Sequence, residues 1–212
     1  MSRPLLITDC DEVLLHMVVP FGEWLDEAHD IFFDLDRLFD PVTGGYLNVM
    51  NNKVSGEAIA GDKVWPLLKG FFATEMHRQQ PTVGAVEAIN ALSAHADVVV
   101  LTNLTDDARD NRAAQLRALG IDFPVYTNQG GKGEPLARIV AAHSPSVTVF
   151  VDDLIHQHDS VAEHAPDTFR LHMIGEPRIA RYAKQADAAH ARIDDWQSAQ
   201  GWIMERFEGK PL

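Results

Sequence analysis

The hydrophobic residues of this chain gather in short uninterrupted runs. Three of these runs are each followed by a cluster of polar residues. The three runs are Pro4 to Thr8, Asp97 to Leu101 and Val147 to Val151. Apolar runs without polar alternation are typical of strands that are buried on both faces of a parallel sheet. Two weaker strand candidates are Phe123 to Thr127 and Thr168 to Ile174. The pattern therefore predicts a parallel sheet built from these segments.

Between these runs the apolar positions change to a helical period. Before the second run they recur at a spacing of three, at Val83, Val86, Ile89 and Leu92. Further along, we expect Thr105 to cap a helix that Gly120 closes, and Pro135 to occupy the first position of the next helix. Strands that alternate with helices of this length indicate a doubly wound α/β sheet, which is the predicted fold class.

From about residue 16 to residue 79 this alternation stops. The stretch holds two helical segments with a Gly/Asn-rich turn region between them, namely Phe21 to Phe39, Ser55 to His77 and the turn region Pro41 to Asn52. We interpret residues 16–79 as a small, mostly helical cap insertion. Residues 1–15 and 80–212 then form the catalytic core.

The net charge changes which partners are expected. Acidic residues outnumber basic ones by 31 to 18, which gives a net charge of −13. Such a surface repels nucleic acid and anionic membranes, so we expect neither as a partner. It also repels anionic substrates, so phosphate chemistry needs a local positive charge such as a metal ion.

The single cysteine, Cys10, excludes an internal disulfide and fits a reducing compartment. No apolar stretch approaches the roughly 18 residues of a membrane span, and we expect a cytoplasmic protein.

The polar clusters stand where ligands bind in open α/β sheets, beyond the carboxyl ends of the strands. We expect six of these residues to converge there, namely Asp9 and Asp11, Thr102 and Asn103, and Asp152 and Asp153. Lys132, just ahead of the helix predicted to begin at Pro135, can reach the same place. Four aspartates at close range cannot all stay ionised without a cation, because each raises the pKa of the others. Oxygen ligands of this kind suit a hard ion, so we predict a Mg²⁺ site that also binds a phosphate group.

The polar clusters also follow one another in a particular order. They are Asp9-x-Asp11 after a strand, Thr102 at the end of a second, Lys132 ahead of a helix, and Asp152-Asp153 after a later strand. In this combination the sequence resembles the haloacid dehalogenase (HAD) superfamily, over about residues 4–15 and 80–175. The resemblance implies a HAD-like core with a cap inserted between its first two motifs. Response-regulator receivers use similar residues, but there the lysine comes last, whereas Lys132 precedes the final acidic pair.

The resemblance implies a role for each motif in the hydrolysis of a small-molecule phosphate monoester. Asp9 would attack phosphorus and form an aspartyl-phosphate. Asp11 would protonate the leaving alcohol and then deprotonate the hydrolytic water. The Thr102 hydroxyl and the Asn103 main-chain N–H would bind the phosphoryl oxygens. Lys132 would also bind phosphate, offset the developing negative charge and hold Asp9 ionised.

For the metal, the resemblance implies Asp9, Asp152 and the main-chain carbonyl of Asp11 as Mg²⁺ ligands, with Asp153 acting through water. Asp11 also separates this chain from true dehalogenases, which share the fold but lack an acid/base at that position. The sequence therefore favours a Mg²⁺-dependent phosphatase. A phosphotransferase or phosphomutase on the same scaffold is one alternative, and a catalytically inactive HAD-like binding module is another.

Other residues near the motifs are open to more than one interpretation. Glu12 stands where HAD members often have glycine, and its carboxylate could contact a metal-bound water, face solvent or weaken phosphate affinity. Cys10, between the two aspartates, is expected to point away from both and to pack in the core. We expect His156, His158 and Asp159 to be solvated residues rather than zinc ligands. The sequence determines neither the natural substrate nor the oligomeric state.

Overall fold

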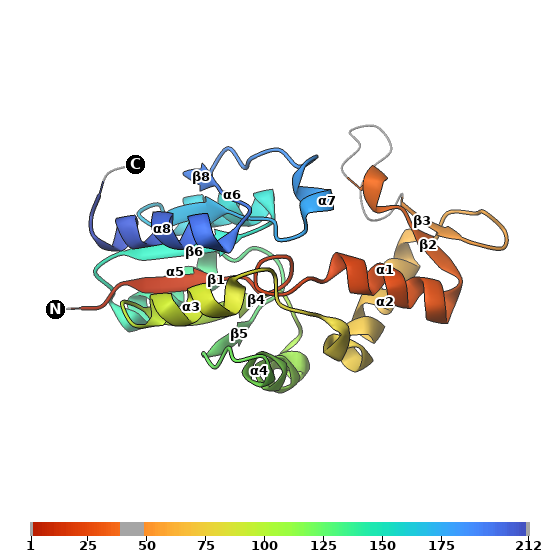
Figure 1. The fold of residues 1–212 in the computed structure, drawn as a ribbon, viewed down its shortest axis with the longest axis horizontal. Coiled ribbons are helices and arrows are strands. Elements are labelled where there is room, and N and C mark those ends of the chain that lie inside the picture. Colours follow the sequence, from red (N-terminus) through yellow and green to blue (C-terminus); the bar gives the residue numbers. More distant parts are fainter. Residues whose placement is uncertain (1, 39–48, 211–212) are drawn as a thin grey trace. The chain divides into compact units, whose positions relative to one another are not determined.

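The structure is a computed structural model that describes residues 2–38 and 49–210. Its first unit is built on a six-stranded parallel sheet with the strand order β5-β4-β1-β6-β7-β8 (Figure 1). The strands are β1 (Leu5–Thr8), β4 (Asp97–Thr102), β5 (Val125–Thr127), β6 (Thr148–Asp152), β7 (Phe169–His172) and β8 (Ala191–Arg192). From β1 the chain winds outward in both directions, as a doubly wound sheet does. The predicted fold class is confirmed.

Helices cover both faces of this sheet, and they are α3 (Ala85–Ser93), α4 (Arg109–Ala118), α5 (Gly133–His143), α6 (Ile155–His164) and α8 (Trp196–Phe207). Successive residues of a strand point to opposite faces. Leu6 of β1 therefore packs with apolar residues of α3, α4 and α8, whereas Leu5 and Ile7 pack with those of α5 and α6. Since both faces of β1 are buried, its sequence shows no polar alternation.

The helix after β4 begins later than the sequence predicts. Thr105 makes no side-chain capping hydrogen bond, and a single 3-10 turn, η3 (Asp106–Ala108), follows it. Helix α4 itself begins at Arg109. Its end agrees with the prediction, because Gly120 lies just beyond the last helical turn with a φ of 87°. Glycine adopts this left-handed conformation without steric cost, which is the reason that it closes helices.

The helix after β5 begins earlier than the sequence predicts. Pro135 is the third residue of α5 rather than the first, because the helix already starts at Gly133. The main-chain N–H of Gly133 donates a hydrogen bond of 3.0 Å to the Ser160 hydroxyl on α6. At this point α5 passes so close to α6 that a Cβ atom on residue 133 would lie 2.1 Å from the Ser160 carbonyl oxygen. Only glycine fits there, and packing against α6 decides where α5 begins.

The second unit contains residues 16–80 together with residues 176–184. Its elements are α1 (Val18–His29), β2 (Ile31–Phe33), η1 (Leu35–Arg37), β3 (Met50–Asn52), α2 (Gly61–Thr74), η2 (Met76–Arg78) and α7 (Pro177–Ala180). The sequence places residues 176–184 in the core, but in the structure they group with the inserted segment. An ion pair of 2.8 Å between Arg181 and Asp36 links the two parts of this unit.

The first predicted helix of the second unit, Phe21 to Phe39, ends ten residues earlier than predicted. Instead of continuing from Phe21 to Phe39, α1 ends at His29, and Asp30 takes a left-handed conformation with a φ of 53°. Aspartate is one of the few residues that adopt this conformation readily. The chain then enters β2, which pairs with β3 so that Phe33 lies opposite Met50. The unit therefore combines helices with a two-stranded antiparallel sheet.

The other predicted helix, Ser55 to His77, is shorter than expected. The Asn52 side chain accepts hydrogen bonds of 2.9 Å from the main-chain N–H groups of Val54 and Ser55, which forms a turn before α2. Residues 39–48, which include most of the predicted turn region Pro41 to Asn52, lie outside the described residues. Across the described ranges, no helix is long and apolar enough to cross a membrane.

Candidate active site

The carboxyl ends of β1, β4 and β6 meet at one edge of the sheet. In the register of the sheet, Thr8 of β1 lies opposite Val151 of β6, and the N–H of Asp9 donates a hydrogen bond of 2.8 Å to the Val151 carbonyl. Asp9 is therefore a direct neighbour of Asp152, the last residue of β6. Thr102 ends β4 on the other side of β1. The sheet topology brings these predicted site residues together.

Lys132 connects two of the aspartates. Its Nζ atom lies 2.7 Å from Oδ1 of Asp9 and 2.6 Å from Oδ2 of Asp152, and all three side chains are buried. The Lys132 main-chain N–H donates a hydrogen bond of 2.7 Å to Oε1 of Gln157 on α6, which anchors the residue ahead of α5. The other carboxylate oxygen of Asp152 accepts a hydrogen bond of 2.9 Å from the N–H of Leu154. The predicted lysine thus lies among the predicted carboxylates.

Burial and neighbouring charges shift the pKa values of this cluster. Burial raises the pKa of Asp9 to about 7, with the Lys132 ammonium opposing the rise and Asp152 and Asp11 adding to it. Burial works to lower the pKa of Lys132, but the carboxylates of Asp152 and Asp9 more than offset it and raise that pKa above its ordinary value. The pKa of Asp153 is raised by burial and by Asp152. Together the carboxylates call for more positive charge than one lysine supplies.

Three of these carboxylates are arranged to hold a cation. One oxygen each from Asp9, Asp152 and Asp153 lie within 4.8 Å of one another. An all-oxygen set of carboxylates suits Mg²⁺, which keeps waters and substrate oxygens in its remaining positions. The residues therefore fit the predicted ion. The Asp11 carboxylate is not part of this group of described side chains.

Thr102 and Asn103, both expected to bind phosphate, differ in how their side chains are used. The Thr102 hydroxyl is fully buried and has no hydrogen-bond partner within the part of the chain that the structure describes. A buried hydroxyl without a partner costs free energy unless a ligand contacts it. The Asn103 amide instead donates a hydrogen bond of 2.9 Å to the Gly130 carbonyl and accepts one of 3.1 Å from Asn128. Asn103 thereby holds the loop that leads to Lys132.

Sequence reasoning missed Arg112 on α4. This side chain is fully buried, and its Nη2 donates hydrogen bonds of 2.9 and 3.0 Å to the two carboxylate oxygens of Asp11. Its Nη1 lies 3.1 Å from Sγ of Cys10, which packs in the core as predicted. Burial raises the pKa of the Cys10 thiol, so it stays protonated. Arg112 stands four residues before the buried Leu116, and an arginine on the apolar face of a predicted helix was the available signal.

Two histidines contact the main-chain carbonyls of Asp152 and Asp153, and one of them was expected to be solvated. His158, predicted to be solvated, is fully buried, with Nε2 3.0 Å from the Asp152 carbonyl oxygen. His172 on β7 accepts a hydrogen bond of 3.0 Å from the N–H of Ala186 at Nδ1, so Nε2 carries the proton and donates to the Asp153 carbonyl over 2.8 Å. Burial lowers the pKa of both rings, that of His158 to about 4. Both are neutral donors that fix the main chain of the pair.

Replacing His172 by phenylalanine is expected to weaken Mg²⁺ binding by about 10- to 100-fold, the usual effect of losing a residue that orients metal ligands. The change keeps an aromatic ring but removes the hydrogen bond to the Asp153 carbonyl. Isothermal titration with Mg²⁺ measures the affinity. The matched control is His190→Phe, which removes a partly buried ring that contacts Arg170. Equal effects of the two substitutions would contradict the assigned role.

Glu12 takes a conformation that glycine would favour. Its φ is 59°, and its side chain is only 2% exposed, so the solvent-facing interpretation is wrong. Its N–H donates to the Leu15 carbonyl over 2.7 Å, and its carbonyl accepts from the N–H of Gly175 over 2.5 Å. The negative charge of Glu12 contributes to raising the pKa of Asp153. Its carboxylate therefore belongs to the surroundings of the metal-ligand cluster.

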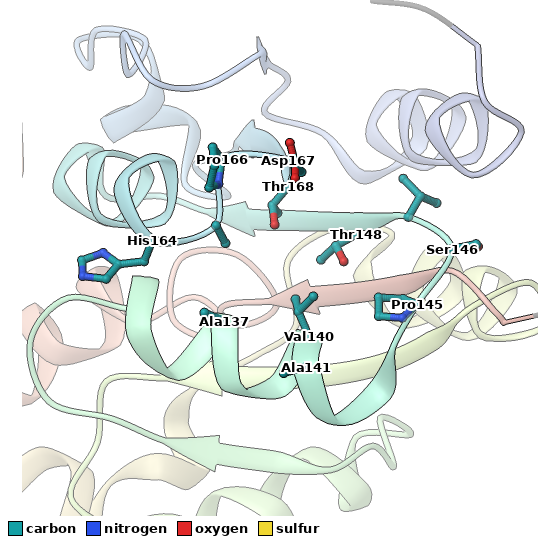
Figure 2. Close-up of a pocket in the computed structure, with 12 residues that line it drawn as sticks. Ala137, Val140, Ala141, Pro145, Ser146, Thr148, His164, Pro166, Asp167 and Thr168 are labelled. Carbon is teal, nitrogen blue, oxygen red and sulfur yellow. The ribbon is translucent and has the colours of Figure 1, made fainter.

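A pocket of about 470 Å³ in the same unit lies elsewhere (Figure 2). It is lined by Val140 of α5, by Thr148 and by Thr168 among others. Thr148 is the first residue of β6, whereas Asp152 is the last. The pocket is therefore at the amino end of β6, at the far edge of the sheet from the acidic cluster. It is not the predicted active site.

The fold of this chain is also found among solved structures. A haloacid dehalogenase-like hydrolase from Streptococcus pneumoniae superposes with a TM-score of 0.64 and 10% identity, over 95% of this chain and 98% of that one. A predicted phosphoglycolate phosphatase from Haemophilus somnus gives a TM-score of 0.63 and 12% identity, over 96% and 99% of the two chains. An L-2-haloacid dehalogenase gives 0.57 and 10%, over 96% and 100%.

The chain therefore has the fold of the HAD-superfamily hydrolases, as its motifs predict. Identities of this size establish the fold and not the reaction, and the similar structures include both a predicted phosphatase and a dehalogenase. No family model matches the sequence, and neither does any curated protein sequence. The reaction has to be argued from the residues of the site.

Proposed function

We propose that this protein is a Mg²⁺-dependent phosphatase that hydrolyses a small-molecule phosphate monoester through an aspartyl-phosphate on Asp9. The observation that carries the proposal is the position of Lys132, whose ammonium group contacts Asp9 and Asp152 beside three carboxylates able to hold a metal ion. A phosphoryl group in transfer spreads negative charge over its oxygens, and fixed cations next to the nucleophile stabilise that charge.

Each residue of the site has a defined step in this reaction. The Asp9 carboxylate attacks phosphorus, the bond to the leaving oxygen breaks, and Asp11 gives that oxygen its proton. Asp11 then takes a proton from water, which attacks phosphorus, releases inorganic phosphate and restores Asp9. Lys132, the Thr102 hydroxyl and the Asn103 main-chain N–H bind the phosphoryl oxygens throughout. Asp9, Asp152 and the main-chain carbonyl of Asp11 would hold Mg²⁺, with Asp153 acting through water, and the ion would add to the neutralisation of the phosphoryl charge.

Two features favour a phosphate ester over a carbon–halogen bond as the target. A halide leaves without a proton, whereas an alcohol needs one, and Asp11 stands two residues after the nucleophile with a partly exposed carboxylate that can deliver it. The Thr102 hydroxyl, which has no hydrogen-bond partner among the described residues, is able to donate to a phosphoryl oxygen. We infer that residues 16–79 serve as the cap that selects the substrate, as the HAD resemblance implies. The net charge of −13 supports a small-molecule partner rather than nucleic acid or a membrane. We propose a cytoplasmic location, since the single cysteine fits a reducing compartment.

The purified protein is expected to release phosphate from p-nitrophenyl phosphate with Mg²⁺ present. Chelation by EDTA should abolish the reaction and added Mg²⁺ should restore it, because the metal-ligand cluster consists of carboxylates that a single lysine cannot neutralise. Parallel assays offer L-2-chloropropionate as a dehalogenation substrate, and a sugar as an acceptor for transferred phosphate. Halide release without phosphate release would refute the phosphatase, and transfer to the sugar in preference to water would indicate a phosphotransferase.

A further inference from the structure

The Arg112 guanidinium is buried in an unusual place for a charged group. It lies on the buried face of α4, one helical turn before the buried Leu116. None of its side chain is exposed. Taking a guanidinium out of water costs several kcal/mol of free energy, and apolar residues of similar size often stabilise such positions better. Stability alone therefore gives a weak reason for an arginine here.

The contacts of Arg112 point to what it does. One terminal nitrogen donates to both oxygens of Asp11, at 2.9 and 3.0 Å, and the other lies 3.1 Å from Sγ of Cys10. An aspartate side chain has two rotatable bonds, and a guanidinium that contacts both carboxylate oxygens restricts both of them. The Cys10 contact fixes the guanidinium in turn. Asp11 is thus held in one orientation while its carboxylate stays partly exposed.

We propose that Arg112 is a positioning residue that holds the Asp11 carboxylate where it can protonate the leaving oxygen. This inference rests on the proposed phosphatase activity. It predicts that the loss of Arg112 lowers the rate of phosphoryl transfer most for the leaving groups that most need a proton. An alkoxide is a poor leaving group and needs protonation, whereas dinitrophenolate leaves without it. Loss of Arg112 should therefore slow transfer from alkyl phosphates and spare transfer from 2,4-dinitrophenyl phosphate.

The experiment measures the phosphorylation of Asp9 in single turnovers, with wild type, Arg112→Met and Arg112→Lys. With an alkyl phosphate, both variants are expected to lose about 100-fold in rate, at the lower end of what a general acid contributes. With 2,4-dinitrophenyl phosphate we expect a loss of less than about threefold. In an Asp11→Asn background, removal of Arg112 should cost nothing further, because the group on which it acts is gone.

Controls separate this role from a loss of structure. Arg206→Met removes another buried arginine, which packs over Trp202 on α8. This variant should not slow transfer from the alkyl phosphate more than transfer from 2,4-dinitrophenyl phosphate. Calorimetry should find Mg²⁺ affinity unchanged within about twofold in the Arg112 variants, since the clustered metal ligands do not include the Asp11 carboxylate. If Arg112→Met does not fold, Arg112→Lys carries the test, because it keeps the charge but loses the second nitrogen, whose contact with Cys10 fixes the group that holds Asp11.

The outcomes distinguish the two proposals. A wild-type protein that transfers phosphate from neither substrate would refute the phosphatase itself. A wild-type protein that is active, with Arg112 variants that lose the same factor on both substrates, would overturn the positioning role and leave the phosphatase intact. Full additivity of Arg112→Met with Asp11→Asn would overturn it as well.

Discussion

Replacing Asp9 by asparagine is expected to lower kcat for p-nitrophenyl phosphate by about 10⁴-fold or more, the scale on which losing the nucleophile acts in enzymes with a covalent intermediate. The amide keeps the shape of the side chain but cannot attack phosphorus. The contact with Lys132 loses its ionic partner as well. Phosphate release measured at saturating Mg²⁺ gives the change in kcat. Acid-quenched reactions with ³²P-labelled substrate should trap label on the wild-type protein and none on the variant.

Stability provides the control for Asp9→Asn. Burial raises the pKa of Asp9 to about 7 in the folded protein, above its ordinary value of 3.8, so the ionised carboxylate destabilises the metal-free fold at pH 8. The neutral variant should therefore unfold at a temperature no lower than the wild type in EDTA. Asp97→Asn, in an exposed ion pair with Arg3 at the other end of the sheet, should leave kcat unchanged within about twofold. Retained turnover by Asp9→Asn would remove Asp9 from the mechanism.

Replacing Lys132 by methionine is expected to lower kcat by about 10³-fold, a loss comparable to removing one fixed donor from a transition-state binding site. It also removes a cation that contacts two buried carboxylates, Asp9 and Asp152. Breaking a buried pair typically costs about 3–5 kcal/mol, so the free energy of unfolding in EDTA should fall by about that amount. Thermal and urea unfolding measure the change.

The same variant should bind Mg²⁺ more tightly than the wild type. Lys132 and the metal ion share the Asp9 and Asp152 carboxylates, and removing one cation strengthens the attraction for the other. Mg²⁺ should therefore recover more stability in Lys132→Met than in wild type, although activity stays low. Lys210→Met, which removes an exposed lysine paired with Glu208, is the matched control. Weaker Mg²⁺ binding by Lys132→Met than by wild type would show that the two cations do not share these ligands.

Several features of the site could be predicted from the sequence because they depend on local order. A strand followed by Asp9-x-Asp11, and a later strand followed by Asp152-Asp153, place carboxylates at the same edge in any parallel sheet. Lys132 follows the same logic at the start of α5. Arg112 could not be predicted in this way, because its partner lies 101 positions away in the chain. His172 was missed since its role depends on the neighbouring β6 main chain.

The helix limits show the same division. The prediction from Phe21 to Phe39 followed an apolar period, whereas the real end at His29 depends on the left-handed Asp30 and on pairing between β2 and β3. Pairing between strands is a contact between distant residues, which local propensity does not contain. The early start of α5 likewise depends on how closely Gly133 packs against Ser160.

The sequence by itself determined the doubly wound sheet, the edge at which the site lies and the identities of the clustered carboxylates and lysine. These follow from hydrophobic period and from the position of polar residues after strands, both of which are local properties. Only the tertiary structure decided that Arg112 holds Asp11, that His158 and His172 support the acidic pair, and that Glu12 is buried. Such contacts arise where elements distant in sequence pack together, and packing is a property of the whole fold.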